Sequence, residues 1–242
     1  MNRKSFLTTS FSLIGISIWP EAWQKKDYSI SILLGKGEPE LYNVDIPLLK
    51  PVGVAFIEMQ KAAKKEGITL EIVSAYRSFK RQKSIWNSKY IRNKKRGVSP
   101  EENITKIIEY STLPGTSRHH WGTDVDLIDG TKTKEGDVLL TDKFHGQGPY
   151  AKMKKWMDKN AANFGFIRPY TADIKRKGFY YEPWHYSYAP IATPMLKEYL
   201  ELNLKTLLST PDLEGSKHLS SDFLTKYRRE NILGIAKELK TF

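Results

Sequence analysis

Residues 117–128 read Ser-Arg-His-His-Trp-Gly-Thr-Asp-Val-Asp-Leu-Ile, and they join a polar loop to an expected strand. The first ten of these residues include two histidines and two aspartates, and Pro114-Gly115 breaks the chain just before them. The run from Thr123 to Ile128 predicts a strand that leaves the loop. This stretch therefore places side chains that can bind a metal at the beginning of a strand.

The segments on either side predict helices and two more strands. Residues 69–74 alternate and are β-branched, which predicts a strand, and residues 180–188 are aromatic and strand-like. Helical spacing of apolar residues, or a capping signal, predicts helices over 52–66, 79–96, from 99 onward, 150–164, 193–208 and 220–239. Together these elements predict an α+β fold in which helices cover a small, mainly antiparallel sheet.

Composition limits the kinds of site that the chain can build. Its 242 residues are 40% hydrophobic and 12% aromatic, which is typical of a folded protein with one well-buried core. The sequence has no cysteine, so disulfide frameworks, thiolate metal sites and cysteine nucleophiles are excluded. A net charge of +12 favours polyanionic surroundings, namely nucleic acid, acidic lipid or an anionic cell-wall polymer, without choosing among them.

The beginning of the chain has the features of a leader. Arg3 and Lys4 precede a mostly apolar run over residues 6–19, and Ala22 is a candidate cleavage point. This pattern predicts a secretory signal peptide over residues 1–22. We therefore expect an exported protein, periplasmic or associated with the cell envelope, with no stable membrane insertion once the leader is removed.

The rest of the chain is interpreted as one domain with an extension. Residues 23–210 contain the elements of the predicted sheet and most of the helices. Residues 211–242 begin with a link rich in Gly, Ser and Pro over residues 211–216, and they are interpreted as a basic C-terminal helical extension that packs on the same domain. The sequence does not indicate an oligomeric state.

A second polar segment places an acid close to an imidazole. Glu182-Pro183-Trp184-His185 separates the two side chains by three residues. The proline and the surrounding aromatic residues argue for a bent strand rather than a helix, because proline removes a donor from the sheet and favours an edge or a bulge. Such a bulge could turn both side chains into one cleft.

Three segments together resemble one family. Ser117-x-His119-x-x-Gly122-x-x-x-Asp126, followed by Glu182-x-x-His185, closely resembles the pattern of the zinc D-Ala-D-Ala carboxypeptidases and dipeptidases related to the vancomycin-resistance enzymes. The upstream Ser-x-Tyr-Arg-Ser-x-x-x-Gln segment of that family is present as residues 74–82. The resemblance covers roughly residues 48–188. It implies a fold like that of the hedgehog proteins and the D,D-peptidases.

The resemblance also implies a zinc site and the roles of its residues. His119, Asp126 and His185 would hold one zinc ion and leave a fourth position for water. Glu182 would be the general base that takes a proton from this metal-activated water. Arg77 would hold a carboxylate or the developing oxyanion. The residues expected to contact substrate are Ser117, Gln82 and Tyr76. The histidines expected to be structural are His120, His145 and His218.

The implied activity is hydrolysis of the terminal D-alanyl-D-alanine bond of peptidoglycan stem peptides. An L,D-carboxypeptidase, a peptidoglycan endopeptidase and a cytosolic D,D-dipeptidase are alternatives with the same chemistry, and the leader argues against the last of these. A non-catalytic zinc-binding module is an alternative of another class, against which Glu182 and Arg77 argue. No motif supports nucleic-acid binding, so no nucleic-acid partner is expected.

One residue departs from the family pattern. Asp124 stands where the family usually has a small residue, most often alanine. The additional carboxylate could change the charge near the metal, point away from the site, or orient an imidazole. Asp129 could also orient an imidazole, although a solvated or turn carboxylate is the preferred interpretation for it. The departure leaves the metal site as expected and the substrate preference open.

Overall fold

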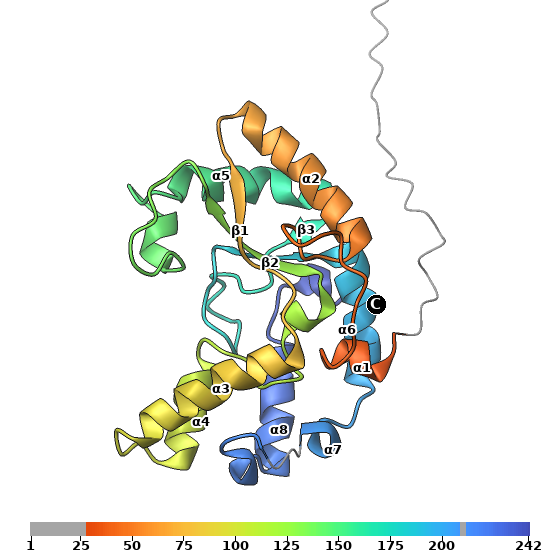
Figure 1. Cartoon of the computed structure of the whole chain (residues 1–242), viewed down its shortest axis with the longest axis vertical. Coiled ribbons are helices and arrows are strands. Elements are labelled where there is room, and N and C mark those ends of the chain that lie inside the picture. The colour runs from red at the N-terminus through yellow and green to blue at the C-terminus, as the bar shows by residue number, and fades with distance from the viewer. Residues whose placement is uncertain (1–27, 209–211) are drawn as a thin grey trace, which may run out of the picture.

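Four short strands form the antiparallel sheet on which the site is built (Figure 1). The structure is a computed structural model that describes residues 28–208 and 212–242. The strand order is β1-β2-β4-β3, and each neighbouring pair is antiparallel. The strands are β1 Leu70–Ser74, β2 Asp124–Asp129, β3 Phe166–Ile167 and β4 His185–Tyr188. The predicted α+β class and the antiparallel sheet are confirmed.

Helices cover this sheet. In the view of Figure 1, α2 and α5 lie at one end of the molecule and α3, α4 and α8 at the other, with the sheet between them. Over the two described ranges, no helix combines the length and the apolar character that a membrane span requires. The α-helices are α1 Ile30–Leu33, α2 Lys50–Lys65, α3 Phe79–Lys94, α4 Pro100–Ile108, α5 Ala151–Asn160, α6 Ala189–Leu200, α7 Leu204–Leu208 and α8 Ser221–Tyr227.

Capping residues explain where two of the predicted helices begin. The Ser78 hydroxyl accepts a hydrogen bond from the backbone N–H of Arg81 at the start of α3. Ser99 caps α4 in the same way through Glu102, and Pro100 occupies the first helical position. A serine at this position satisfies a backbone donor that the helix itself leaves unpaired. The predicted starts at these two places are confirmed.

The helix predicted to begin at Thr193 begins earlier and is shorter. The chain turns from β4 directly into α6, whose first turn contains Pro190, and Pro194 lies inside the helix. The predicted start was wrong because the proline that occupies the first turn, where proline is favoured, is Pro190 and not Pro194. The helix ends at Leu200, and α7 forms separately.

The single helix predicted over residues 220–239 is also wrong. Helix α8 passes into a π-helical turn, Arg228–Ile232, and a separate 3₁₀ turn follows at Lys237–Leu239. The break lies at Gly234, where a Cβ atom would stand 1.9 Å from the carbonyl oxygen of Glu230 and 2.2 Å from that of Lys177. Only glycine allows this close approach of backbone, and the chain bends there.

The C-terminal residues pack against the loop that leads into the site. The backbone N–H of Leu113 donates to the hydroxyl of Tyr227 at 3.1 Å, and this hydroxyl lies 2.9 Å from that of Thr116. Tyr227 is buried in the same apolar core as the sheet. The proposed division of the chain between residues 210 and 211 stays a prediction. The expected leader, residues 1–22, lies outside the described residues.

Candidate metal centre

The pairing of β2 with β4 places acidic and imidazole side chains on one face of the sheet. Asp126 is the cross-strand partner of His185, and Asp124 is the partner of Ser187. Because side chains alternate along a strand, residues two apart point the same way, so these four side chains share a face. The intervening residues of β2 are apolar and pack into the core on the other face.

His119 comes from the 3₁₀ turn Arg118–Trp121 that precedes β2. The turn ends at Gly122 in the left-handed conformation, with φ +66°, which glycine adopts without steric cost. The ring Nδ1 of His119 donates to the carbonyl oxygen of Ala75 at 2.8 Å. A carbonyl can only accept, so this bond fixes the tautomer, and Nε2 keeps its lone pair. That nitrogen faces Oδ2 of Asp126 at 3.3 Å.

Glu182 and His185 are brought together by a tight turn, not by the bulged strand that we expected. The backbone N–H of His185 bonds to the carbonyl of Glu182 at 3.3 Å, and β4 begins only at His185. Pro183 occupies the second position of the turn, where its restricted φ is favourable. The first and fourth side chains of the turn meet, with Glu182 Oε2 2.9 Å from His185 Nδ1.

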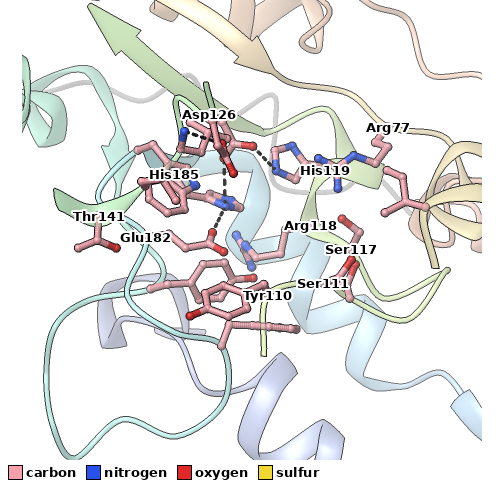
Figure 2. Close-up of a pocket in the computed structure, with 18 of the residues that line it drawn as sticks. Arg77, Tyr110, Ser111, Ser117, Arg118, His119, Asp126, Thr141, Glu182 and His185 are labelled. Carbon is pink, nitrogen blue, oxygen red and sulfur yellow. Dashed lines mark hydrogen bonds and ion pairs between the residues drawn. The ribbon is translucent and has the colours of Figure 1, made fainter. Parts of the chain in front are cut away.

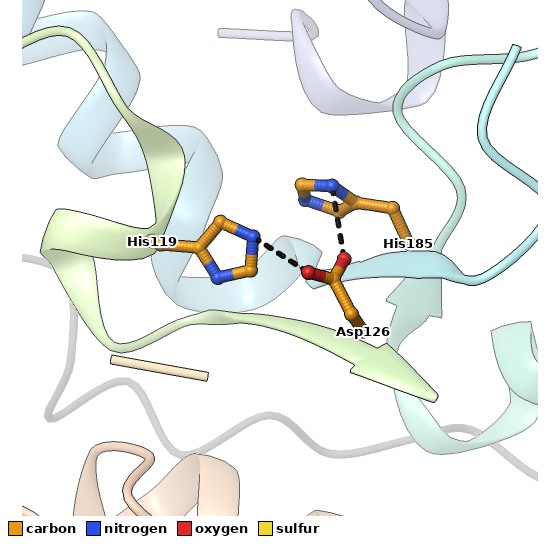
Figure 3. Close-up of side chains that lie close together, drawn as sticks. All are labelled: His119, Asp126 and His185. Atoms are coloured by element: carbon orange, nitrogen blue, oxygen red, sulfur yellow. Dashed lines mark ion pairs between the residues drawn. The ribbon is translucent and has the colours of Figure 1, made fainter. Parts of the chain in front are cut away.

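Three candidate metal ligands converge at this place (Figure 3). The ligand atoms of His119, Asp126 and His185 all lie within 4.8 Å of one another, and the three residues are buried. Asp126 Oδ1 lies 3.4 Å from His185 Nδ1, is buried, and has no hydrogen-bond partner in the described chain. A buried carboxylate oxygen normally has a partner, and two imidazoles with one carboxylate form a donor set that suits Zn²⁺. The residues therefore fit a zinc ion.

The charges around His185 favour a cation at this position. Burial by itself would lower the pKa of His185, but Asp126, Asp124 and Glu182 outweigh it and raise the pKa to about 10. The imidazolium form balances part of the negative charge of these carboxylates. A divalent cation beside Nδ1 would balance the same charge and take the place of the proton.

The convergent atoms line a cleft of about 570 Å³. Figure 2 shows Arg77, Ser117 and Glu182 around the two histidines. Glu182 has 15% of its side chain exposed, whereas Ser117 is almost completely buried at the cleft wall. A cleft of this size matches the usual volume of a small-ligand site. The cleft therefore combines a metal-binding donor set with room for a substrate.

The family of the chain follows from its sequence match. The model of the VanY family, described as D-alanyl-D-alanine carboxypeptidase, matches residues 46–191, which is more than half of the chain. The chain belongs to this family. The match spans every residue of the convergent metal set and Glu182.

A curated relative and two solved structures are similar to the chain. The D-alanyl-D-alanine carboxypeptidase of Enterococcus faecalis is 29% identical over 151 residues, covering 62% of this chain and 51% of that protein. The structure of VanYB in complex with D-alanine-D-alanine matches with TM-score 0.51 and 24% identity over 73% of this chain and 91% of that one. The LdcB LD-carboxypeptidase structure matches with TM-score 0.50 and 26% identity over 70% and 78% of the two chains. The chain spans about half the length of the first curated relatives it matches.

Two residues of the VanY-family pattern do not reach the cleft. Gln82 is completely buried, and its side-chain amide donates to the carbonyl of Thr112 at 2.8 Å. The hydroxyl of Tyr76 donates to the carbonyl of Gly37 at 3.1 Å. Neither side chain lines the cleft, so the expected direct contact of Gln82 and Tyr76 with substrate is corrected. Through these hydrogen bonds, both side chains hold the segment that follows β1 against the rest of the protein.

Side-chain hydrogen bonds to Gln82 and Ser74 fix the guanidinium of Arg77. Its Nη1 donates to Oε1 of Gln82 at 2.9 Å, and its Nη2 donates to the hydroxyl of Ser74 at 2.8 Å. The backbone N–H of Arg77 bonds to the carbonyl of His119 at 3.0 Å. These bonds connect Arg77 to the turn that carries His119. Gln82 therefore acts as a support for Arg77.

The two extra aspartates of β2 have different surroundings. Oδ2 of Asp124 lies 2.9 Å from Nε2 of His185, so the interpretation in which Asp124 points away from the site is wrong. Asp129 accepts bonds from the backbone N–H groups of Thr69 and Thr131 at the other end of the strand. The interpretation of Asp129 as a turn carboxylate is confirmed.

Several of the residues that line the cleft were not predicted from the sequence, among them three polar side chains. Arg118, Tyr170 and Lys89 line the cleft beside the metal-binding side chains. The ring of Tyr170 meets His185 edge-on, with centroids 5.0 Å apart, and burial raises the pKa of its hydroxyl well above the usual value. Of the three, only Arg118 had a signal in the sequence, because it stands between the motif residues Ser117 and His119. Tyr170 and Lys89 belong to segments without a motif.

His120 braces the site from behind, in agreement with its expected structural role. Its Nδ1 donates to the carbonyl of Arg77, and its Nε2 accepts the backbone N–H of Gly115 at 3.0 Å. The ring is completely buried, and this burial lowers the pKa of His120 to about 4. A proton on Nε2 would point at the backbone N–H of Gly115, so the folded protein keeps the imidazole of His120 neutral.

We expect acid to destabilise the fold through His120. Between pH 6.5 and about 4 the unfolded chain binds a proton at this imidazole that the folded protein excludes. The stabilisation is therefore fully present above pH 6.5 and falls by about 3 kcal/mol as the pH approaches 4. Urea denaturation at several pH values measures the effect. His120→Gln should show a smaller loss over this range, and equal losses in the two proteins would contradict the assignment.

Proposed function

We propose that this chain is a zinc-dependent D-alanyl-D-alanine carboxypeptidase that hydrolyses the terminal peptide bond of peptidoglycan stem peptides. The observation that carries the proposal is the convergence of His119, Asp126 and His185 beside Glu182 in one cleft. Membership of the VanY family supports the substrate class. The same cleft with any of these side chains turned away would not support a hydrolase.

The metal would supply the electrophilic part of the chemistry. His119 Nε2, an oxygen of Asp126 and His185 Nδ1 would hold it, since these are the atoms that face one another. When bound, zinc polarises a carbonyl and lowers the pKa of a coordinated water toward about 7. The carbonyl of Ala75 keeps the ring of His119 in the tautomer that leaves Nε2 free for this purpose.

Glu182 would move the proton. Its Oε2 lies at the edge of the donor set, 2.9 Å from His185 Nδ1, and part of the side chain is open to the cleft. From this position the carboxylate can accept a proton from the attacking water and deliver it to the nitrogen of the departing amine. Water adds to the carbonyl carbon, the carbon–nitrogen bond breaks, and a free amino acid leaves.

Arg77 and Ser117 would bind the polar groups of the peptide. The guanidinium lines the cleft and keeps donors free after its bonds to Ser74 and Gln82. Burial lowers the pKa of Arg77, but arginine remains charged near neutral pH. A fixed cation at this place suits the terminal carboxylate that a carboxypeptidase must recognise, or the charge that develops on the attacked oxygen.

An L,D-carboxypeptidase acting on a tetrapeptide is the second candidate. The likeness to the LdcB LD-carboxypeptidase structure, at 26% identity, supports it. The metal and the acid would be the same in both reactions, so the difference depends on the stereochemistry that the cleft accepts. Both substrates lie in the cell envelope, and we infer export from the leader-like residues 1–22 alone.

Defined muropeptides test the function. Purified protein is incubated with a pentapeptide and with a tetrapeptide muropeptide, and the products are weighed by mass spectrometry. We expect the pentapeptide to lose one alanine, a chelator to stop the reaction, and added zinc to restore it. Loss of alanine from the tetrapeptide alone would favour the second candidate. Cleavage that continues after complete removal of metal would overturn the zinc mechanism.

A further inference from the structure

Asp124 contacts the imidazole of His185 on the side of the ring that faces away from Asp126. Its Oδ2 lies 2.9 Å from Nε2 of His185, while Nδ1 of the same ring faces Asp126. The two ring nitrogens of an imidazole point in different directions, so one can bind a metal while the other donates to a carboxylate. Both residues are buried, and water does not compete for this bond.

Other donors hold the carboxylate of Asp124 in place. Arg118 Nε donates to Oδ2 at 2.9 Å, and the hydroxyls of Ser187 and Thr123 donate to Oδ1 at 2.7 and 2.8 Å. A further nitrogen of Arg118 donates to Ser187. Both oxygens are therefore engaged by fixed groups, and the position of the carboxylate does not depend on His185 itself.

Strand pairing explains why Asp124 reaches the ring. Asp124 and Asp126 lie two residues apart on β2 and point to the same face, and His185 stands opposite Asp126 on β4. Asp124 is thus the diagonal neighbour of His185, within reach of the outer nitrogen of the imidazole. Strand β2 therefore supplies the candidate ligand Asp126 and also Asp124, which contacts the outer nitrogen of the candidate ligand His185.

We propose that Asp124 is a positioning residue of the metal centre: it accepts the Nε2 proton of His185 and so keeps Nδ1 free and aimed at the metal. This inference rests on the proposed metal-dependent function. A carboxylate behind a ligating imidazole fixes the tautomer and the ring orientation, and it makes the imidazole a stronger ligand. The set of three convergent ligands does not include Asp124.

Asp129 provides a matched control on the same strand. It is also completely buried, and Oδ1 accepts bonds from the N–H groups of Thr69 and Thr131. It does not line the cleft. Aspartate-to-asparagine exchange at either position changes one buried carboxylate of β2 to an amide of equal size. An effect on the metal is expected at Asp124 alone.

The experiment measures zinc affinity by competition with a chromophoric chelator and compares thermal unfolding of the metal-free proteins. In the wild type, Arg118, Ser187, Thr123 and His185 donate to the two carboxylate oxygens of Asp124. The asparagine side chain of Asp124→Asn has one acceptor oxygen, so the hydrogen bond from His185 should be lost or weakened. We expect zinc to bind about 10–100-fold more weakly to Asp124→Asn and within about threefold of wild type to Asp129→Asn. A folded Asp124→Asn protein with unchanged zinc affinity would overturn the proposal.

A measurement on the unmodified protein covers the case in which Asp124→Asn does not fold. Long-range proton–nitrogen NMR of the zinc-loaded wild type should show His185 protonated at Nε2 and unprotonated at Nδ1. The opposite pattern, with the proton on Nδ1, would overturn the proposal. Both tests are independent of turnover. Failure of the zinc-loaded wild type to release alanine would instead contradict the proposed function and leave these results intact.

Discussion

Replacing Glu182 by glutamine should lower kcat for alanine release by about 10²–10⁴-fold while the protein keeps its zinc. Glutamine has nearly the same shape as glutamate but cannot accept a proton near neutral pH. The side chain lies beside His185 and opens into the cleft, so the change removes proton transfer and little else. Steady-state kinetics with a pentapeptide substrate and metal analysis of the purified variant measure the two quantities.

A glutamate of β1 supplies the comparison for this variant. Glu71 pairs with Lys134 on the protein surface and does not line the cleft, so Glu71→Gln should keep wild-type kcat. If Glu182→Gln turned over at the wild-type rate, another group would have to move the proton. If the variant lost its zinc, Glu182 would be a ligand and not the base.

Replacing Asp126 by asparagine should remove both zinc binding and turnover. Asp126 is the one carboxylate among the three convergent residues, and its oxygens lie between the two imidazoles. A neutral amide oxygen is a much weaker ligand for Zn²⁺ than a carboxylate. We expect zinc affinity to fall by more than the roughly 10–100-fold predicted for a residue that acts through a ligand. Chelator competition and alanine release measure this.

The two variants separate the two parts of the site. Glu182→Gln should be inactive with zinc bound, whereas Asp126→Asn should be inactive because zinc does not bind. Zinc held by Asp126→Asn at wild-type affinity would mean that the metal lies elsewhere. The convergence of buried nitrogens of His119 and His185 on Asp126 would then need another explanation.

Much of the candidate site was predictable because its residues stand in short patterns with fixed spacing. The resemblance that these patterns carry implied a metal centre of His119, Asp126 and His185 with Glu182 beside it, and the structure brings these four side chains together. The run from Thr123 to Ile128 predicted the strand that carries Asp126. These are local signals, and local signals survive folding when the strand or turn that carries them forms as expected.

The interpretation of the upstream segment was less successful for a physical reason. Tyr76, Arg77 and Gln82 all looked available to substrate, because residue type alone does not show whether a polar side chain faces a cleft or the protein. The structure leaves Arg77 in the cleft and uses the other two to hold the protein together. A buried amide such as that of Gln82 must find partners inside the protein, and it finds Arg77 and Thr112.

By itself the sequence determined the fold class, the absence of thiolate ligands, and which side chains could form a metal centre. Tertiary structure alone decided that β2 pairs with β4 in the register that puts Asp126 opposite His185 and Asp124 behind it. It also decided that a turn, not a bulge, carries Glu182. Strand partners and their register depend on packing between distant segments, and a one-residue shift would have turned these side chains to the other face.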